Sequence, residues 1–157
     1  MKFILTDELG RLSRWLRILG FDTVVEKDKR SLVLKSLRDE RIILTRDSKM
    51  ARFTGTRILH IDSDFVEKQL AQVIDSLGIQ IDQNKLFTLC ILCDAELESV
   101  DKSSVREIVP KYVYETQDAF MKCPKCGKIY WQGSHWELVK KFLNNIKGQE
   151  AGDKGQG

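Results

Sequence analysis

Two pairs of cysteines constrain the fold of this chain more than any other feature of its sequence. Cys90 and Cys93 form one CxxC pair, Cys123 and Cys126 form the other, and residues 94–122 separate them. The amino terminus, MKFILTDELG, turns acidic too early for a secretory signal, which predicts a cytoplasmic location and reduced thiols. In that setting the pairs indicate one Zn²⁺ site rather than two disulfides. Four sulfur ligands leave no open position for water, so this predicted zinc site is structural.

The first half of the chain alternates between short β-type runs and helix-type runs. Leucines in the segment 9–19 recur at the three- and four-residue spacing of an amphipathic helix. Short strands that alternate with helices predict a parallel sheet covered by helices. The predicted strands are 2–6, 22–25, 41–44 and 56–61, and the predicted helices are 9–19, 31–40, 48–53 and 65–77.

The domain boundaries follow from where these patterns stop. Gly78 stands just past the last periodic residue of a helix, where a C-cap glycine is expected. Ser134 and Glu137 have the capping-box spacing at the start of a closing helix, predicted over 133–146. No stretch approaches the roughly 18 apolar residues of a membrane span, so no membrane association is expected. The predicted parts are an α/β domain (1–77), a connector (78–88), a zinc-binding module with a carboxyl-terminal helix (89–147) and a disordered tail (148–157).

Each predicted strand leads into acidic residues. The carboxyl ends of parallel strands meet at one edge of a sheet, and carboxylates gathered there repel one another unless cations lie among them. Oxygen ligands suit Mg²⁺ or Mn²⁺, which can support hydrolysis of phosphodiester bonds. The alternative is that these acids are helix N-caps or solvated loop residues, and Asp64 with Glu67 fits such a capping pattern. The acids are Asp7 and Glu8, Glu26 and Asp28, Asp47, and Asp62 and Asp64, in the order of the four strands.

Three arginines recur at every third residue of the first predicted helix, on the side away from its leucines. Arg11, Arg14 and Arg17 follow shortly after Asp7, so they could contact the phosphates of a polyanion that approaches the acids. The alternative is an ordinary solvated helix face. The formal net charge of +3 permits a polyanionic partner without requiring one.

Four groups of residues are distinctive in combination: LGRLSRWLRILGFDT (9–23), IILTRD (42–47), the two CxxC pairs and YWQGSHWE (130–137). Together they resemble the mutator-seven C-terminal RNase domain family, and the resemblance covers residues 2–146. It implies a PIN-like α/β core with a parallel four-stranded sheet flanked by helices, followed by a small zinc ribbon and a carboxyl-terminal helix. It also implies ribonuclease activity, with RNA as the partner, structural Zn²⁺ and catalytic Mg²⁺ or Mn²⁺.

The resemblance also implies roles for particular residues. In the family, the first acid stands four residues before the glycine that matches Gly10; this chain has Thr6 there and Asp7 one residue later. The implied ligands of Mg²⁺ or Mn²⁺ are Asp7, Asp28 and Asp47, with Glu26 and Asp64 as further catalytic residues. If the protein is a ribonuclease, the predicted RNA contacts are the three arginines of the first helix and the arginine before Asp47: Arg11, Arg14, Arg17 and Arg46.

Two functions therefore stand side by side. The first is a metal-dependent ribonuclease that hydrolyses RNA at the carboxylate cluster. The second is a non-catalytic adaptor, in which a degenerate PIN-like core and the zinc ribbon bind RNA or a protein. Replacing Asp47 by Asn separates them, because asparagine preserves a helix cap but removes the negative charge that a metal ion needs.

Overall fold

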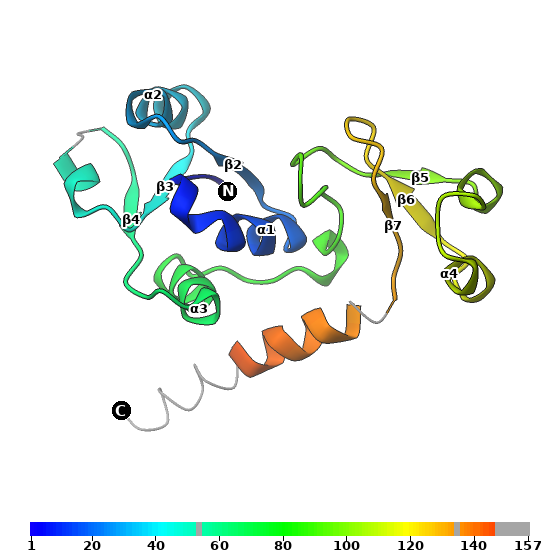
Figure 1. Cartoon of the computed structure of the whole chain (residues 1–157). Helices are drawn as coiled ribbons and strands as arrows, with labels where there is room; N and C mark the ends of the chain where they lie inside the picture. The colour runs from blue at the N-terminus through cyan, green and yellow to red at the C-terminus, as the bar shows by residue number, and fades with distance from the viewer. Residues whose placement is uncertain (53–54, 134–135, 147–157) are drawn as a thin grey trace. The chain divides into compact units, whose positions relative to one another are not determined.

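The structure is a computed structural model that describes residues 1–52, 55–133 and 136–146. The chain divides into two compact units, Met1–Asp94 and Ala95–Gly157 (Figure 1). The predicted capping residue Ser134 and the predicted tail 148–157 lie outside the described residues. Among the described residues, no helix is long and apolar enough to span a membrane.

The first unit contains a fully parallel sheet of four strands, in the order β2-β1-β3-β4. Its register aligns Phe3 of β1 with Thr23 of β2 and with Ile42 of β3. The central strand β3 is buried along its whole length, as a strand covered on both faces should be. The strands are β1 (Lys2–Leu5), β2 (Asp22–Val25), β3 (Ile42–Thr45) and β4 (Ile58–His60).

Helices cover both faces of this sheet (Figure 1). On one face, α2 contacts β1 and β3, and Ile4, Leu32 and Ile43 form a buried cluster there. On the other face, α1 and α3 contact each other. The helices are α1 (Gly10–Ile18), α2 (Lys29–Asp39) and α3 (Val66–Ser76). This arrangement confirms the predicted α/β class with a parallel four-stranded sheet.

Short 3₁₀ turns occur in the first unit at Asp7–Leu9, Ser48–Arg52 and Gln83–Lys85. The predicted helix 48–53 is therefore one of these turns, because so short a segment gains few α-helical hydrogen bonds.

The segment after α3 belongs to the first unit and packs beside the end of α1. Gly78 has φ +60°, as predicted for a glycine that ends a helix. Further along, the backbone N–H of Phe87 donates to the carbonyl of Ile18 at 2.9 Å. A Cβ added at Gly20 would lie 2.6 Å from the carbonyl oxygen of Lys85, so this close approach requires glycine.

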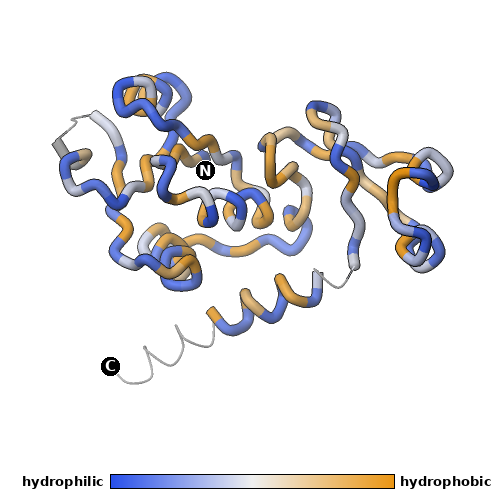
Figure 2. The backbone as a smooth tube through the Cα atoms, in the orientation of Figure 1, coloured by the Kyte–Doolittle hydropathy of each residue, from blue (hydrophilic) through white to orange (hydrophobic). Residues whose placement is uncertain are grey.

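The second unit is built around a small antiparallel sheet in the order β5-β6-β7. Its apolar core is small and consists of Val105, Val109, Val113, Phe120 and Ile129. Residues 136–146 are helical, with Val139, Leu143 and Ile146 buried. Figure 2 shows apolar and polar residues alternating along the turns of this helix. The labelled elements are β5 (Glu98–Val100), α4 (Lys111–Thr116), β6 (Phe120–Lys122) and β7 (Ile129–Tyr130).

Candidate metal centre and carboxyl-edge site

The four cysteines form one cluster. The Sγ atoms of Cys90, Cys93, Cys123 and Cys126 all lie within 4.8 Å of one another, and all four residues are thiols. Zinc–sulfur bonds of about 2.3 Å in a tetrahedron require sulfur–sulfur separations of about 3.8 Å, so the donor set and its spacing fit Zn²⁺. Within the described part of the chain, no other three His, Cys, Asp or Glu side chains gather this closely.

Backbone hydrogen bonds shape the cysteine turn that begins at Cys123. The N–H groups of Lys125 and Cys126 both donate to the Cys123 sulfur at 3.4 Å, and these hydrogen bonds hold the turn around that sulfur. Gly127 then closes the turn: its N–H donates to the Cys123 carbonyl at 2.9 Å, and its φ is +80°.

The acidic site lies at the carboxyl edge, which we define as the edge of the first sheet where β1, β2, β3 and β4 end. After β1, the side chain that contacts this edge is Glu8, whose Oε1 accepts hydrogen bonds from the Thr6 hydroxyl at 2.5 Å and from the Arg46 N–H at 3.2 Å. Asp7 is exposed on the 3₁₀ turn. The sequence placed both acids after the strand, but only the turn geometry distinguishes Glu8 from Asp7.

The two acids after β2 have different environments. Glu26 is 21% exposed, and its Oε2 lies 3.4 Å from the Lys35 ammonium. Asp28 is the N-cap of α2, because its Oδ2 accepts from the N–H and the hydroxyl of Ser31 at 2.9 and 2.8 Å. These hydrogen bonds hold the pKa of Asp28 below its usual range. The capping alternative is therefore correct for Asp28.

Asp47 follows β3 and has two partners. Its Oδ2 lies 2.6 Å from the Lys29 ammonium, and its Oδ1 accepts from the Lys49 N–H at 2.9 Å. The Lys29 contact, followed by the Lys49 N–H, lowers the pKa of Asp47 from its ordinary value. Asp47 is thus ionised at neutral pH, and it caps the turn that follows β3 while its side chain stays 26% exposed.

Asp64, the second of the two acids after β4, is not a helix cap. Phe65 is the N-cap residue of α3, and its N–H donates to the Ser63 hydroxyl at 3.1 Å. Asp64 instead forms an ion pair with Arg46, which follows β3. The capping alternative for Asp64 and Glu67 is therefore wrong, because the N-cap position belongs to Phe65, one residue after Asp64.

The donor chemistry of the carboxyl edge fits a hard divalent cation, since Glu8, Glu26, Asp47 and Asp64 offer carboxylate oxygens alone. Their arrangement is different from that of the cysteine cluster. Among the described residues, no three acids bring their oxygens within 4.8 Å of one another. Lysine and arginine side chains of the same chain neutralise Asp47 and Asp64.

The four predicted RNA-binding arginines separate into two groups. Arg11 and Arg14 are exposed on α1. Arg17 is only 11% exposed, and it donates hydrogen bonds to the carbonyls of Thr23 and Ile91. Arg46 is engaged with Asp64. Two of the four, Arg11 and Arg14, thus present their charge to solvent.

The chain thus combines a parallel α/β sheet that has acids at its carboxyl edge with a four-cysteine cluster that could hold zinc. The family model of the Mut7-C RNAse domain matches residues 1–143, and the chain belongs to this family. This match confirms the resemblance seen in the sequence. No curated protein and no solved structure matches the chain.

Proposed function

We propose that this protein is a divalent-metal-dependent ribonuclease that hydrolyses RNA at the carboxyl edge of its first sheet. The observation that carries the proposal is the sequence of acids along that edge. In the spatial order of the strands, each one is followed by a carboxylate: Glu26, Glu8, Asp47 and Asp64. Membership of an RNase domain family supports RNA as the substrate.

Asp47 is the proposed centre of the site, because it follows a central strand and is ionised at neutral pH. Glu8 and Glu26 follow the next two strand ends, and with the exposed Asp7 they would supply further oxygens to Mg²⁺ or Mn²⁺. When bound, such a cation supplies activation of water and neutralisation of phosphate charge.

Arg11 and Arg14 are the proposed phosphate contacts. Both are exposed on α1, which begins directly after the turn that carries Asp7 and Glu8. Their cationic groups can hold the backbone of a strand of RNA beside the acids and offset its repulsion from them.

Replacing Asp47 by Asn is expected to lower RNA cleavage by about 100-fold or more. Loss of a residue that only hydrogen-bonds to a metal ligand already costs about 10–100-fold, and Asp47 is proposed to contact the metal itself. The asparagine oxygen can still accept from the Lys49 N–H, so the cap is kept. The measurement is cleavage of end-labelled single-stranded and structured RNA with Mn²⁺, Mg²⁺ or EDTA.

The matched control for this test is Asp39→Asn. Asp39 ends α2 and pairs with Arg38, away from the carboxyl edge, so this change should leave cleavage as it was. Equal cleavage by the wild type and Asp47→Asn, or cleavage that persists in EDTA, would contradict the proposed site.

The adaptor remains a second candidate because of one observation. Lys29 and Arg46 already neutralise Asp47 and Asp64, so these acids do not require a metal ion to offset their charge. A chain of this kind would keep its fold and bind RNA or protein without cutting either.

Lys29→Gln separates the two candidates. If the carboxyl edge binds metal, removing the ammonium that competes for Asp47 should strengthen Mn²⁺ binding about two- to fivefold, as expected for a solvent-exposed pair. Electron paramagnetic resonance of free Mn²⁺ measures this affinity. Lys27→Gln, which changes an exposed lysine just before α2, is the control and should change this affinity less. Absence of Mn²⁺ binding in the wild type and in Lys29→Gln favours the adaptor.

A further inference from the structure

Asp94 closes the cysteine turn that begins at Cys90 in a backbone conformation that favours glycine. Its φ is +64°, and its N–H donates to the Cys90 carbonyl at 2.9 Å. Gly127 occupies the same place after Cys123, with the same hydrogen bond. Left-handed backbone is disfavoured for residues with a side chain, although aspartate tolerates it better than most. Because aspartate replaces glycine at one of two equivalent turns, we expect its side chain to make a contact that glycine cannot make.

The Asp94 carboxylate binds the open side of an edge strand. β2 lies at one edge of the sheet, and its Thr23 is fully buried. Because the N–H of Glu26 donates inward to Leu5 of β1, the alternate residue Thr23 turns its N–H and carbonyl away from β1. Asp94 Oδ1 accepts from that Thr23 N–H at 2.9 Å.

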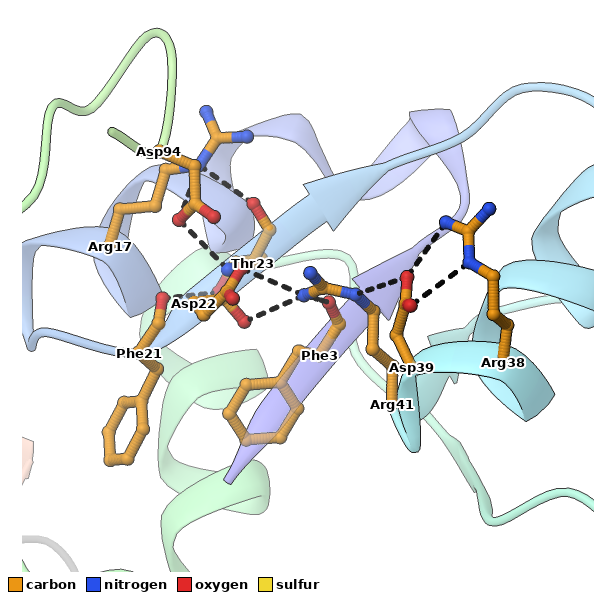
Figure 3. Close-up of polar contacts among 9 residues, drawn as sticks. All are labelled: Phe3, Arg17, Phe21, Asp22, Thr23, Arg38, Asp39, Arg41 and Asp94. Atoms are coloured by element: carbon orange, nitrogen blue, oxygen red, sulfur yellow. Dashed lines mark hydrogen bonds and ion pairs between the residues drawn. The ribbon is translucent and has the colours of Figure 1, made fainter. Parts of the chain in front are cut away.

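Arg17 completes the contact. Its Nε donates to the outward carbonyl of Thr23 at 3.0 Å, and its Nη1 donates to the carbonyl of Ile91 at 2.8 Å. The same Nε lies 3.6 Å from Asp94 Oδ1, and both side chains are nearly buried, at 11% and 13% exposed. Figure 3 shows Arg17 and Asp94 converging on Thr23. Both outward backbone groups of Thr23 are thus satisfied by Arg17 and by the end of the cysteine turn.

We propose that zinc binding at the four cysteines controls the order of strand β2 through Asp94 and Arg17. Zinc fixes the turn from Cys90 to Cys93, and that turn places Asp94 and the Ile91 carbonyl against Thr23 and Arg17. Without zinc the turn is released, and the buried outward groups of Thr23 lose their partners.

The consequence for the carboxyl edge rests on the proposed ribonuclease function. β2 ends at Val25, and Glu26 follows directly. Disorder in β2 therefore displaces one of the acids, so zinc acts as a regulator of the edge site as well as a structural ion. The coupling itself does not depend on any cleavage of RNA.

Coupling of this kind is reciprocal. If zinc orders β2, a change that breaks the contact to Thr23 makes opening of β2 more frequent. The same change must then lower the affinity for zinc by a similar factor. A contact that merely lies beside the zinc site would leave zinc affinity unchanged.

Asp94→Gly in the full-length, zinc-loaded chain is the direct test. Glycine keeps the left-handed turn, as Gly127 does, but removes the carboxylate. Hydrogen–deuterium exchange of the β2 segment should be about tenfold faster than in the wild type with zinc still bound. Zinc affinity, measured by competition with a chromophoric chelator, should fall by a similar factor. Arg17→Met should behave alike, whereas Arg14→Met, an exposed arginine on the same helix, should change neither quantity.

Unchanged exchange of β2 in zinc-loaded Asp94→Gly and Arg17→Met would overturn the proposal, as would equal exchange of β2 in zinc-bound and chelated wild type. If chelation unfolds the whole chain, the zinc-loaded variants decide the question. Faster exchange in the variants together with no RNA cleavage by the wild type would retain the coupling and reject the ribonuclease. RNA cleavage by the wild type, together with unchanged exchange of β2 in the variants, would retain the ribonuclease and reject the coupling.

Discussion

Replacing Cys123 by Ser is expected to abolish tight zinc binding and to unfold the three-stranded unit that begins at Ala95. Cys123 is completely buried, and its sulfur accepts two backbone N–H groups. The apolar core of this unit is small, so we expect its folding to need the binding free energy of a metal ion at the cysteines.

The measurements are zinc content by mass spectrometry of the native protein and near-ultraviolet circular dichroism. Trp131 packs against the core of this unit, so its signal reports on tertiary structure there. Lys125→Ala is the control, since its exposed side chain lies in the same turn and only its backbone contacts the sulfur. Retention of zinc and of the aromatic signal in Cys123→Ser would show that the cluster is not a structural zinc site.

Replacing Arg41 by Met should destabilise the first unit by about 2–4 kcal/mol, because three part-buried oxygen acceptors lose a charged donor. Arg41 is 10% exposed, and its Nη1 donates to the carbonyls of Phe3 and Asp22 at 3.2 and 3.3 Å and to Asp22 Oδ1 at 2.8 Å. It therefore ties β1 to β2 at the amino-terminal end of the sheet (Figure 3).

Urea denaturation monitored by circular dichroism measures this loss. Arg38→Met is the matched control, because Arg38 is 69% exposed and pairs with Asp39 in solvent. Its effect should be much smaller, as solvent-exposed ion pairs contribute little. Equal effects of the two changes would mean that burial of Arg41 adds nothing to the stability of the sheet.

The strand and helix pattern was predictable because it depends on local periodicity. The four β-type runs lie within one or two residues of the observed strands, and the order of elements is the expected one. The α/β class followed from short strands that alternate with helices. Even so, the helix predicted over 48–53 is a 3₁₀ turn, since the choice between helix types depends on packing at each end of a short segment.

The side chains of the candidate site were less predictable, because their directions depend on turns and on residues far away in the chain. Asp7 and Glu8 are adjacent in sequence, yet only Glu8 contacts the end of β3. Arg17 shares the spacing of Arg11 and Arg14, but it contacts Ile91, more than seventy residues away.

The amino-acid sequence alone determined the class of the fold, the four cysteines and the placement of acids after each strand, because these features depend only on the order of residues over short stretches of chain. Only the tertiary structure decided which acids are caps, which are neutralised by Lys29 and Arg46, and that Asp94 and Arg17 cover the edge of β2. Those outcomes depend on contacts between residues distant in sequence, and a one-dimensional pattern carries no record of which distant side chains meet.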